Sequence, residues 1–438
     1  MPIRKLKARQ ILDACGRPTV EVDLITDIGL LRSSVPSALV FVENEAKEIR
    51  DGDQAVYAGH AVTKVVDSIN NTIAPELLKS KLEVNQQREI DLLLQSLDGT
   101  PDKSKLGRNA MLGVSVACCK AAAAKRGLPL YRYIAVLSEN QDICLPVPQF
   151  SLISGGHSAG NTLVYREFLI MPTGANSFAE ALRVGSEIYR VLELKLAEMQ
   201  ELQPPLGVGD RGSFVPQLED DKEALATLDE AIKEAGYEGK VKIGLDVAAT
   251  TFCQDGKYDL EYKTGESDPE NHLEPDAFRE QYAELLTEFP SIVSLEDPFD
   301  REDWDSWTAL TTAQPAVQIV ADELTVTSAE RLEEAIEKQA ANCLVVRPGQ
   351  AGTISEALDC VKMARDAGWG CLISAGQCET EETFVADFAV GVSAGQIKAG
   401  APCRGERVAK YNQVLRIEEE LGQSAKYAGE RFRQPLAG

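Results

Sequence analysis

The sequence predicts an α/β protein in which a small N-terminal α+β domain precedes an eight-stranded α/β barrel. The first 34 residues alternate apolar and polar side chains, as an antiparallel meander does. From about residue 143 onward, short apolar runs alternate with amphipathic segments, which is typical of strands and helices wound into a closed barrel. At 438 residues the chain is also too long for one simple core. We therefore expect domains at 1–137 and 143–438, joined by a polar link.

The N-terminal domain is expected to begin with strands and to continue with helices. Turn residues at 16–18 and 27–29 divide the opening meander into three strands. Helical periodicity follows over 45–97 and again over 109–126, where alanine is frequent. This order predicts a small sheet with helices packed against it.

The barrel elements follow from apolar runs of strand length and the amphipathic stretches between them. The expected strands are 146–151, 168–171, 242–246, 292–296, 319–322, 343–346, 370–374 and 396–398. The expected helices include 178–199, 221–235, 275–288, 328–338 and 353–367. Eight strands with intervening helices predict a closed parallel barrel.

Three acidic residues, Asp246, Glu296 and Asp322, each end one of these apolar runs. Because the carboxyl ends of barrel strands meet at one mouth, we expect the three carboxylates to converge. Carboxylates crowded into a partly dry site repel one another, so a hard cation such as Mg²⁺ or basic side chains must lie between them. The alternative is that each acid only caps the helix that follows its strand.

The overall composition argues against some classes of binding partner and indicates a cellular location. The formal net charge of −24 and the pI near 4.7 argue against nucleic acid and anionic membrane surfaces. Ten cysteines without a CxxC pair indicate reduced thiols and a cytoplasmic location. The sequence has neither an apolar leader nor an apolar run of about 18 residues, so we expect no secretion and no membrane span.

Several long strings carry a resemblance to a known family. They are DACGRPTVE (13–21), LGRNAMLGVS (106–115), LEDPFD (295–300), DELTVT (322–327), GQIK (395–398) and AKYNQVLRIEEEL (409–421). With these strings the sequence resembles enolase, phosphopyruvate hydratase, over essentially its whole length. The resemblance implies an α+β cap on a TIM-like barrel and the Mg²⁺-dependent dehydration of 2-phosphoglycerate in glycolysis. It also implies Asp246, Glu296 and Asp322 as magnesium ligands.

The positions that match the family's proton-handling residues are altered. The family base is a lysine, and Arg347 stands at the matching position. The family acid is a glutamate within GDEGGF, where this chain has Arg211 in GDRGSF. Arginine stays protonated at any workable pH, so neither residue can exchange a proton with a substrate.

Three loops that surround the family's substrate also differ. The SHRSG string reads SAGQC at 374–378, which removes the phosphate-holding arginine, and the SGASTG loop reads SALVFV at 37–42. Val40 in that loop has no oxygen to offer magnesium. The GGSHAGN loop has its order exchanged, so the imidazole moves to His157. Glu167, Lys398 and the three acids are retained.

These departures predict an enolase-like pseudoenzyme with a structural or protein-interaction role. Arg166, Arg211 and Arg347 place guanidinium groups where the family has Gln, Glu and Lys, and we expect them to neutralise the acids in place of Mg²⁺. Three alternatives remain: a magnesium-dependent hydratase, a lyase of altered substrate with Lys398 as base, or a binder of another anionic metabolite through His157, Lys398 and these arginines.

Enolases are usually homodimers, and the resemblance places Arg9 and Glu21 against the partner's Glu406 and Arg416. All four residues are present in this sequence. We therefore expect a homodimer or a place in a larger protein assembly. The alternative is that these residues are ordinary surface charges.

Overall fold

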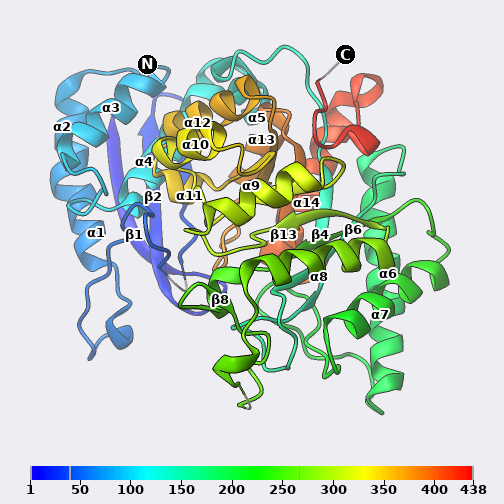
Figure 1. The fold of residues 1–438 in the computed structure, drawn as a ribbon. Helices are drawn as coiled ribbons and strands as arrows, with labels where there is room; N and C mark the ends of the chain where they lie inside the picture. The colour runs from blue at the N-terminus through cyan, green and yellow to red at the C-terminus, as the bar shows by residue number, and fades with distance from the viewer. Residues whose placement is uncertain (1, 39–40, 266, 437–438) are drawn as a thin grey trace.

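The computed structural model describes residues 2–38, 41–265 and 267–436 (Figure 1). The N-terminal sheet contains β1 (Lys5–Leu12), β2 (Pro18–Thr26) and β3 (Gly29–Ser34), paired antiparallel in that order. Gly16 and Gly29 take positive φ angles of 72° and 119° at the two turns, which glycine adopts without steric cost. The predicted meander is therefore confirmed.

The first helix of this domain begins later than the periodicity predicts, whereas the helix predicted over 109–126 is present to within a residue at either end. They are α1 (Thr63–Ser68), α2 (Ala74–Ser80), α3 (Gln87–Asp98), α4 (Arg108–Lys125) and α5 (Leu130–Leu137), with a π-helical turn at Ile69–Ile73. Residues 45–62 contain only a 3₁₀ turn at Tyr57–Gly59, so the expected helix over 45–97 is wrong in its first part. Gly52, Tyr57 and Ala58 have positive φ angles there, and such angles cannot continue a right-handed helix.

The second domain is a closed barrel of eight strands, as predicted. Around the barrel the order is β10, β11, β12, β13, β4, β5, β6 and β9. In chain order the strands are β4 (Val147–Ser154), β5 (Glu167–Met171), β6 (Lys242–Asp246), β9 (Ile292–Glu296), β10 (Gln318–Ala321), β11 (Cys343–Val346), β12 (Gly370–Ser374) and β13 (Gly395–Gly400). A separate two-stranded ribbon pairs β7 (Cys253–Gln254) with β8 (Lys257–Tyr258).

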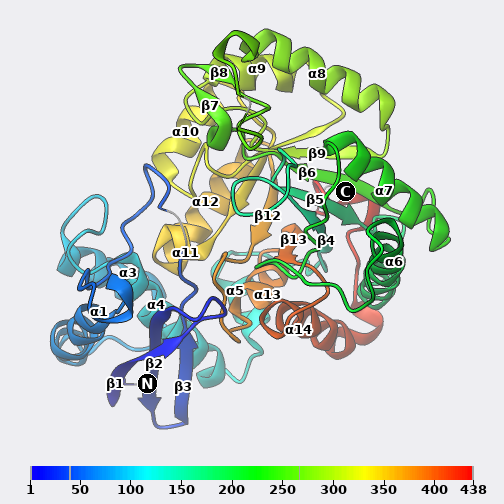
Figure 2. The same cartoon turned by 90° about the horizontal axis from the view of Figure 1, so that it is seen from below.

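Helices surround this barrel (Figure 2). They are α6 (Phe178–Met199), α7 (Asp221–Glu234), α8 (Pro275–Glu288), α9 (Trp304–Ala313), α10 (Ala329–Glu337), α11 (Pro348–Ala351), α12 (Ile354–Asp366), α13 (Phe384–Gly391) and α14 (Gly405–Leu421). Each of the five helices expected from the sequence is present to within a residue at either end. Among the described helices, none is both long and apolar enough to cross a membrane.

The barrel is mixed rather than parallel, which corrects the expectation of a purely parallel sheet. Strand β5 runs antiparallel to both of its neighbours, β4 and β6. Residues 155–166, between β4 and β5, contain no helix. A parallel neighbour requires a crossover, usually helical, so this helix-free link returns the chain antiparallel instead.

The N-terminal domain packs against α11 and α12 of the barrel through α3 and α4 (Figure 2). A buried polar bridge crosses this interface. Arg108 lies 3.0 Å from a carboxylate oxygen of Glu45, and the side chain of Gln350 donates to Glu45 over 2.7 Å. Because buried charges are stable only when paired, this bridge fixes how the cap lies over the barrel mouth.

Candidate functional site

Three carboxylates lie together at the carboxyl ends of adjacent barrel strands. Asp246 is the last residue of β6, Glu296 is the last residue of β9, and Asp322 follows β10 directly. The strand register places Asp246 opposite Glu296. All three side chains are at most 3% exposed. The structure therefore brings together the three acids that the sequence places at strand ends.

Lys398 of β13 extends its ammonium group between these acids. Its Nζ lies 2.9 Å from Asp246 Oδ2, 2.6 Å from Glu296 Oε1 and 3.7 Å from Glu167 Oε1. The side chain is 1% exposed. Burial acts to lower the pKa of Lys398, but the negative charges of Asp246 and Glu296 outweigh it and raise this pKa to about 12. The lysine is therefore a fixed cation at neutral pH.

Arg166, just before β5, contacts all three acids. Its Nη2 lies 2.8 Å from Asp246, 3.5 Å from Asp322 and 3.8 Å from Glu296. Its Nε also donates to Asp246 Oδ2 over 2.9 Å. Burial acts to lower the pKa of Arg166, yet the surrounding carboxylates raise it well above its ordinary value. The guanidinium therefore lies among the acids as a permanent charge.

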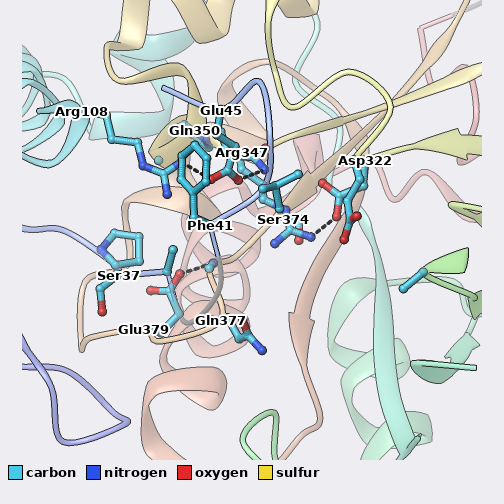
Figure 3. Close-up of a pocket in the computed structure, with 18 of the residues that line it drawn as sticks. Ser37, Phe41, Glu45, Arg108, Asp322, Arg347, Gln350, Ser374, Gln377 and Glu379 are labelled. Atoms are coloured by element: carbon cyan, nitrogen blue, oxygen red, sulfur yellow. Dashed lines mark hydrogen bonds and ion pairs between the residues drawn. The ribbon is translucent and has the colours of Figure 1, made fainter. Parts of the chain in front are cut away.

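Two further arginines pair with the remaining acids. Arg347, at the end of β11, donates from Nη2 to Asp322 Oδ2, and Figure 3 shows this bond beside Ser374. Arg211 lies with its Nη1 2.5 Å from Glu167 Oε1. Each of these two arginines therefore pairs with an acid of the site, and the structure places Arg166, Arg211 and Arg347 in one cluster.

Two acids that the sequence reasoning missed also belong to this cluster. Asp297 is buried with a positive φ of 47°, and its Oδ1 accepts hydrogen bonds from the backbone N–H groups of Asp322 and Glu323. Glu323 lies 3.2 Å from Arg166 Nη1. Each follows one of the three recognised acids directly in the strings LEDPFD and DELTVT, and that adjacency was the available signal.

The cluster does not balance in charge when every group is ionised. It contains four cations, Arg166, Arg211, Arg347 and Lys398, and six carboxylates, Glu167, Asp246, Glu296, Asp297, Asp322 and Glu323. Burial, together with repulsion from Asp246, raises the pKa of Glu296 to about 8. Burial also raises the pKa of Asp297 well above its usual range. Protons held by these acids bring the cluster closer to neutrality.

Asp246 behaves in the opposite way. Burial acts to raise its pKa, but the charges of Arg166, Lys398 and Arg211 outweigh that effect and hold the pKa well below its usual range. Asp246 therefore stays ionised, while the raised pKa values of Glu296 and Asp297 favour their protonated forms.

A cavity of about 320 Å³ opens beside the cluster and is lined by both domains. The N-terminal domain contributes Ser37, Phe41 and Arg108, which Figure 3 shows with Gln377 and Glu379 of the barrel. His157 is exposed at this cavity and contacts none of the three acids through a described hydrogen bond or ion pair. Val40 lies outside the described residues.

The arrangement of cations does not fit a magnesium ion between the three acids. Magnesium takes oxygen ligands at about 2.0–2.1 Å. Arg166 Nη2 lies within 3.8 Å of an oxygen of each acid, and Lys398 Nζ lies within 2.9 Å of two of them. An ion bound to those oxygens would stand directly against two positive nitrogens. Arg166, which contacts all three acids, would have to move away before the metal could enter.

Comparison with known families covers almost the whole chain. The model described as "Enolase, N-terminal domain" matches residues 3–134. The model described as "Enolase, C-terminal TIM barrel domain" matches residues 142–436. These matches agree with the α+β domain and the barrel seen in the structure.

Proposed function

The chain belongs to the enolase family, and from that premise we propose that it is a noncatalytic member with a structural or protein-interaction role. The observation that carries the proposal is the position of Arg166, whose guanidinium contacts Asp246, Glu296 and Asp322. This guanidinium supplies positive charge where the family has Mg²⁺. Forked guanidinium contacts are well suited to this, since they pair with carboxylates in fixed geometry.

The groups that would move protons support the same proposal. Arg347 stands where the family has its base, and the charges of Asp322 and its neighbours keep its pKa raised against the effect of burial. Arg211 stands where the family has its acid and pairs with Glu167. A general base must lose its proton near the working pH, and an arginine does not. Proton abstraction from 2-phosphoglycerate therefore has no acceptor at this position.

An activity assay tests the proposal. Purified protein with millimolar Mg²⁺ and 2-phosphoglycerate is expected to form phosphoenolpyruvate no faster than an Asp246→Ala variant purified in the same way. Contaminating host enzyme would give equal rates in both preparations, so the matched variant measures the background. Dehydration by the unaltered protein well above that of the variant would overturn the proposal.

Restoring one residue should not restore the reaction. Arg347→Lys returns the family's base, but Arg211 still occupies the position of the acid, and the loop at 374–378 still lacks the phosphate-holding arginine. We expect no hydratase activity from this variant in the same assay. Activity from this single change would mean that the rest of the site is functional.

A magnesium-dependent lyase is the second candidate, and one observation favours it. Asp246 Oδ1, Glu296 Oε2 and Asp322 Oδ1 are buried, and the structure gives them no hydrogen-bond partner among the described residues. Oxygens of this kind could bind a cation once Arg166 had moved away. Lys398 would be the base on another 2-hydroxy acid, although its pKa of about 12 opposes that role.

Magnesium calorimetry distinguishes the two candidates. If the protein is noncatalytic, we expect no heat of Mg²⁺ binding from the unaltered protein. The Arg166→Gln variant should bind Mg²⁺, because this change removes the guanidinium that contacts all three acids and installs the residue that the family has there. The lyase candidate expects the unaltered protein to bind Mg²⁺ and to turn over a member of a hydroxy-acid panel. Screening that panel in the presence of Mg²⁺ would also identify the alternative substrate.

We further propose that the protein is a cytoplasmic homodimer or part of a larger assembly, with functional domains at 1–137 and 143–438. Within one chain Arg9 already pairs with Glu21, and Glu406 pairs with Arg404, whereas Arg416 is exposed. A dimer contact would therefore extend existing ion pairs. Light scattering coupled to gel filtration is expected to give twice the 47.6 kDa chain mass.

A further inference from the structure

Two cysteines that are far apart in sequence meet where the domains join. Cys15 lies in the turn between β1 and β2, and Cys378 lies in the loop after β12. Their Sγ atoms and a carboxylate oxygen of Asp13 all lie within 4.8 Å of one another. Cys378 is fully buried, whereas Cys15 is partly exposed.

Hydrogen bonds fix the backbone segments that carry Cys15 and Cys378. Ala14 N–H donates to the carbonyl of Glu379 over 2.8 Å, and Ser37 N–H donates to the carbonyl of Cys378 over 2.9 Å. Arg407 is buried beneath the same loop and donates to the carbonyl of Gly376 over 2.8 Å. The two sulfur atoms therefore face each other from segments that are already fixed. A disulfide requires an S–S separation of about 2.05 Å, so its formation would bring the two sulfur atoms closer than the 4.8 Å limit within which they lie here.

The hydrogen bonds of Asp13 favour a dithiol pair over a metal site. Its Oδ1 accepts from the backbone N–H groups of Cys15 and Arg17 at 2.8 and 3.0 Å, and its Oδ2 accepts from the hydroxyl of Ser37. Both oxygens are thus engaged in holding the turn. Asp13 would have to give up those hydrogen bonds to serve as a third metal ligand beside the two cysteines.

We propose that Cys15 and Cys378 form a reversible disulfide that ties the N-terminal domain to the loop after β12. The bond would join the two walls of the cavity, because Ser37 and Gln377 beside it both line that space. Redox-sensitive cysteines are accessible to solvent and often lie next to a second cysteine that resolves the first product, and Cys15 lies in this way beside Cys378. Such a bond is compatible with a reducing compartment when it forms transiently.

The chemistry balances with a small-molecule disulfide as the oxidant. The Cys15 thiolate attacks one sulfur of that disulfide, whose S–S bond breaks and releases one thiolate. Cys378 then loses its proton to the released thiolate or to solvent and attacks the Cys15 sulfur of the mixed disulfide, which releases the second thiol. Two protein thiols are oxidised by two electrons, and the small disulfide is reduced to two thiols.

The groups around the two cysteines indicate which thiol attacks the small disulfide and which resolves the mixed disulfide. A hydrogen bond from the Cys378 thiol lowers the pKa of Cys15, helped by the positive charge of Arg407 and opposed by burial and by Asp13 and Asp210. The same hydrogen bond and burial raise the pKa of Cys378. Cys15 is therefore the better nucleophile and the more accessible sulfur, so it attacks first.

Incubating the full-length protein with oxidised glutathione tests the proposal. Peptide mass spectrometry is expected to find a Cys15–Cys378 crosslink that dithiothreitol reverses, and the amides of Ser37 and Cys378 should exchange hydrogen more slowly in the oxidised protein. Cys15→Ser and Cys378→Ser should each abolish the crosslink. Cys253→Ser is the matched control, because Cys253 is also partly exposed and should leave the crosslink unchanged.

A second measurement does not depend on any variant folding. With limiting iodoacetamide at pH 7.5, Cys15 of the unaltered protein should react at least about tenfold faster than Cys253, whose pKa burial raises to about 11. Equal alkylation rates, or glutathionylated Cys15 that never resolves to the crosslink, would overturn the proposal. So would stoichiometric zinc binding lost in both serine variants, since it would make the pair a metal site.

Discussion

The barrel interior contains two buried polar networks, one neutral and one charged, on the same strands. The neutral network joins Gln149, Gln318 and Gln396, with amide bonds of 2.8 and 2.9 Å, and reaches the hydroxyl of Ser294 over 3.0 Å. The charged cluster begins two residues further along, at Lys398 on β13 and Glu296 on β9. Side chains two residues apart on a strand share a face, so the networks form successive layers of one interior.

The two layers satisfy their polar atoms differently. Gln396 both accepts from and donates to Gln318, so the neutral layer closes on itself. The charged layer leaves one oxygen each of Asp246, Glu296 and Asp322 without a hydrogen bond among the described residues. A neutral network contributes the same stability at every ordinary pH, whereas a charged one depends on which protons it holds. Both layers would thus stabilise the barrel, and only the contribution of the charged layer would depend on pH.

Removing the ammonium group of Lys398 should lower the free energy of unfolding most, and it would disrupt only the charged layer. Lys398→Met removes the ammonium group that lies 2.9 Å from Asp246 and 2.6 Å from Glu296 in a buried site, which is expected to lower the free energy of unfolding by about 3–5 kcal/mol. Chemical denaturation at pH 7 measures the change. Lys362→Met is the control, because that lysine pairs with Asp366 on the surface and should leave stability unchanged within error. A loss as small as the control's would show that the cluster contributes little.

Removing the central amide tests the neutral layer and should have a smaller effect. Gln396→Leu leaves the side-chain N–H groups of Gln149 and Gln318 without their shared acceptor. The free energy of unfolding is expected to fall by about 1–3 kcal/mol, the usual cost of unpaired buried amides. Denaturation at pH 5 and pH 8 should give the same loss. A loss that varied with pH would mean that the two layers are coupled.

The sequence predicts the barrel well because local patterns determine its elements. Apolar runs and amphipathic stretches locate the barrel strands and helices within a few residues. The direction of β5 was missed because strand pairing depends on the link at 155–166, and its lack of a helix carries no periodic signal. The early start of the helical region was wrong because backbone angles at Tyr57 and Ala58 are set by the loop around them rather than by their own side chains.

The sequence predicts most residues of the candidate site, although Asp297 and Glu323 were missed, but it does not predict their contacts. Asp246, Glu296 and Asp322 are predictable because strand ends converge at a barrel mouth. The shared contact of Arg166 with all three depends on a long side chain entering from a loop, and no sequence spacing fixes that geometry. The contact of Cys15 with Cys378 joins positions in different domains, so only the packing of the cap on the barrel reveals it.

The pH dependence of the free energy of unfolding should distinguish the charged layer from the neutral one. Burial and the charge of Asp246 raise the pKa of Glu296 to about 8 from its ordinary value of 4.5. Between these values the folded chain holds a proton that the unfolded chain has lost, so the free energy of unfolding decreases as pH rises from about 4.5 to 8. One proton contributes a slope of at most about 1.4 kcal/mol per pH unit.

Glu296→Gln removes that proton and keeps the shape of the side chain, so its stability should fall less steeply across this range. Asp297 and Glu323, whose pKa values burial also raises, add slopes of the same sign to both proteins, so the difference between the two profiles reports Glu296. Urea denaturation at half-unit steps from pH 5 to 8 measures both profiles. Parallel profiles would mean that Glu296 stays ionised beside Lys398, and the charged layer would then resemble the neutral one in its indifference to pH.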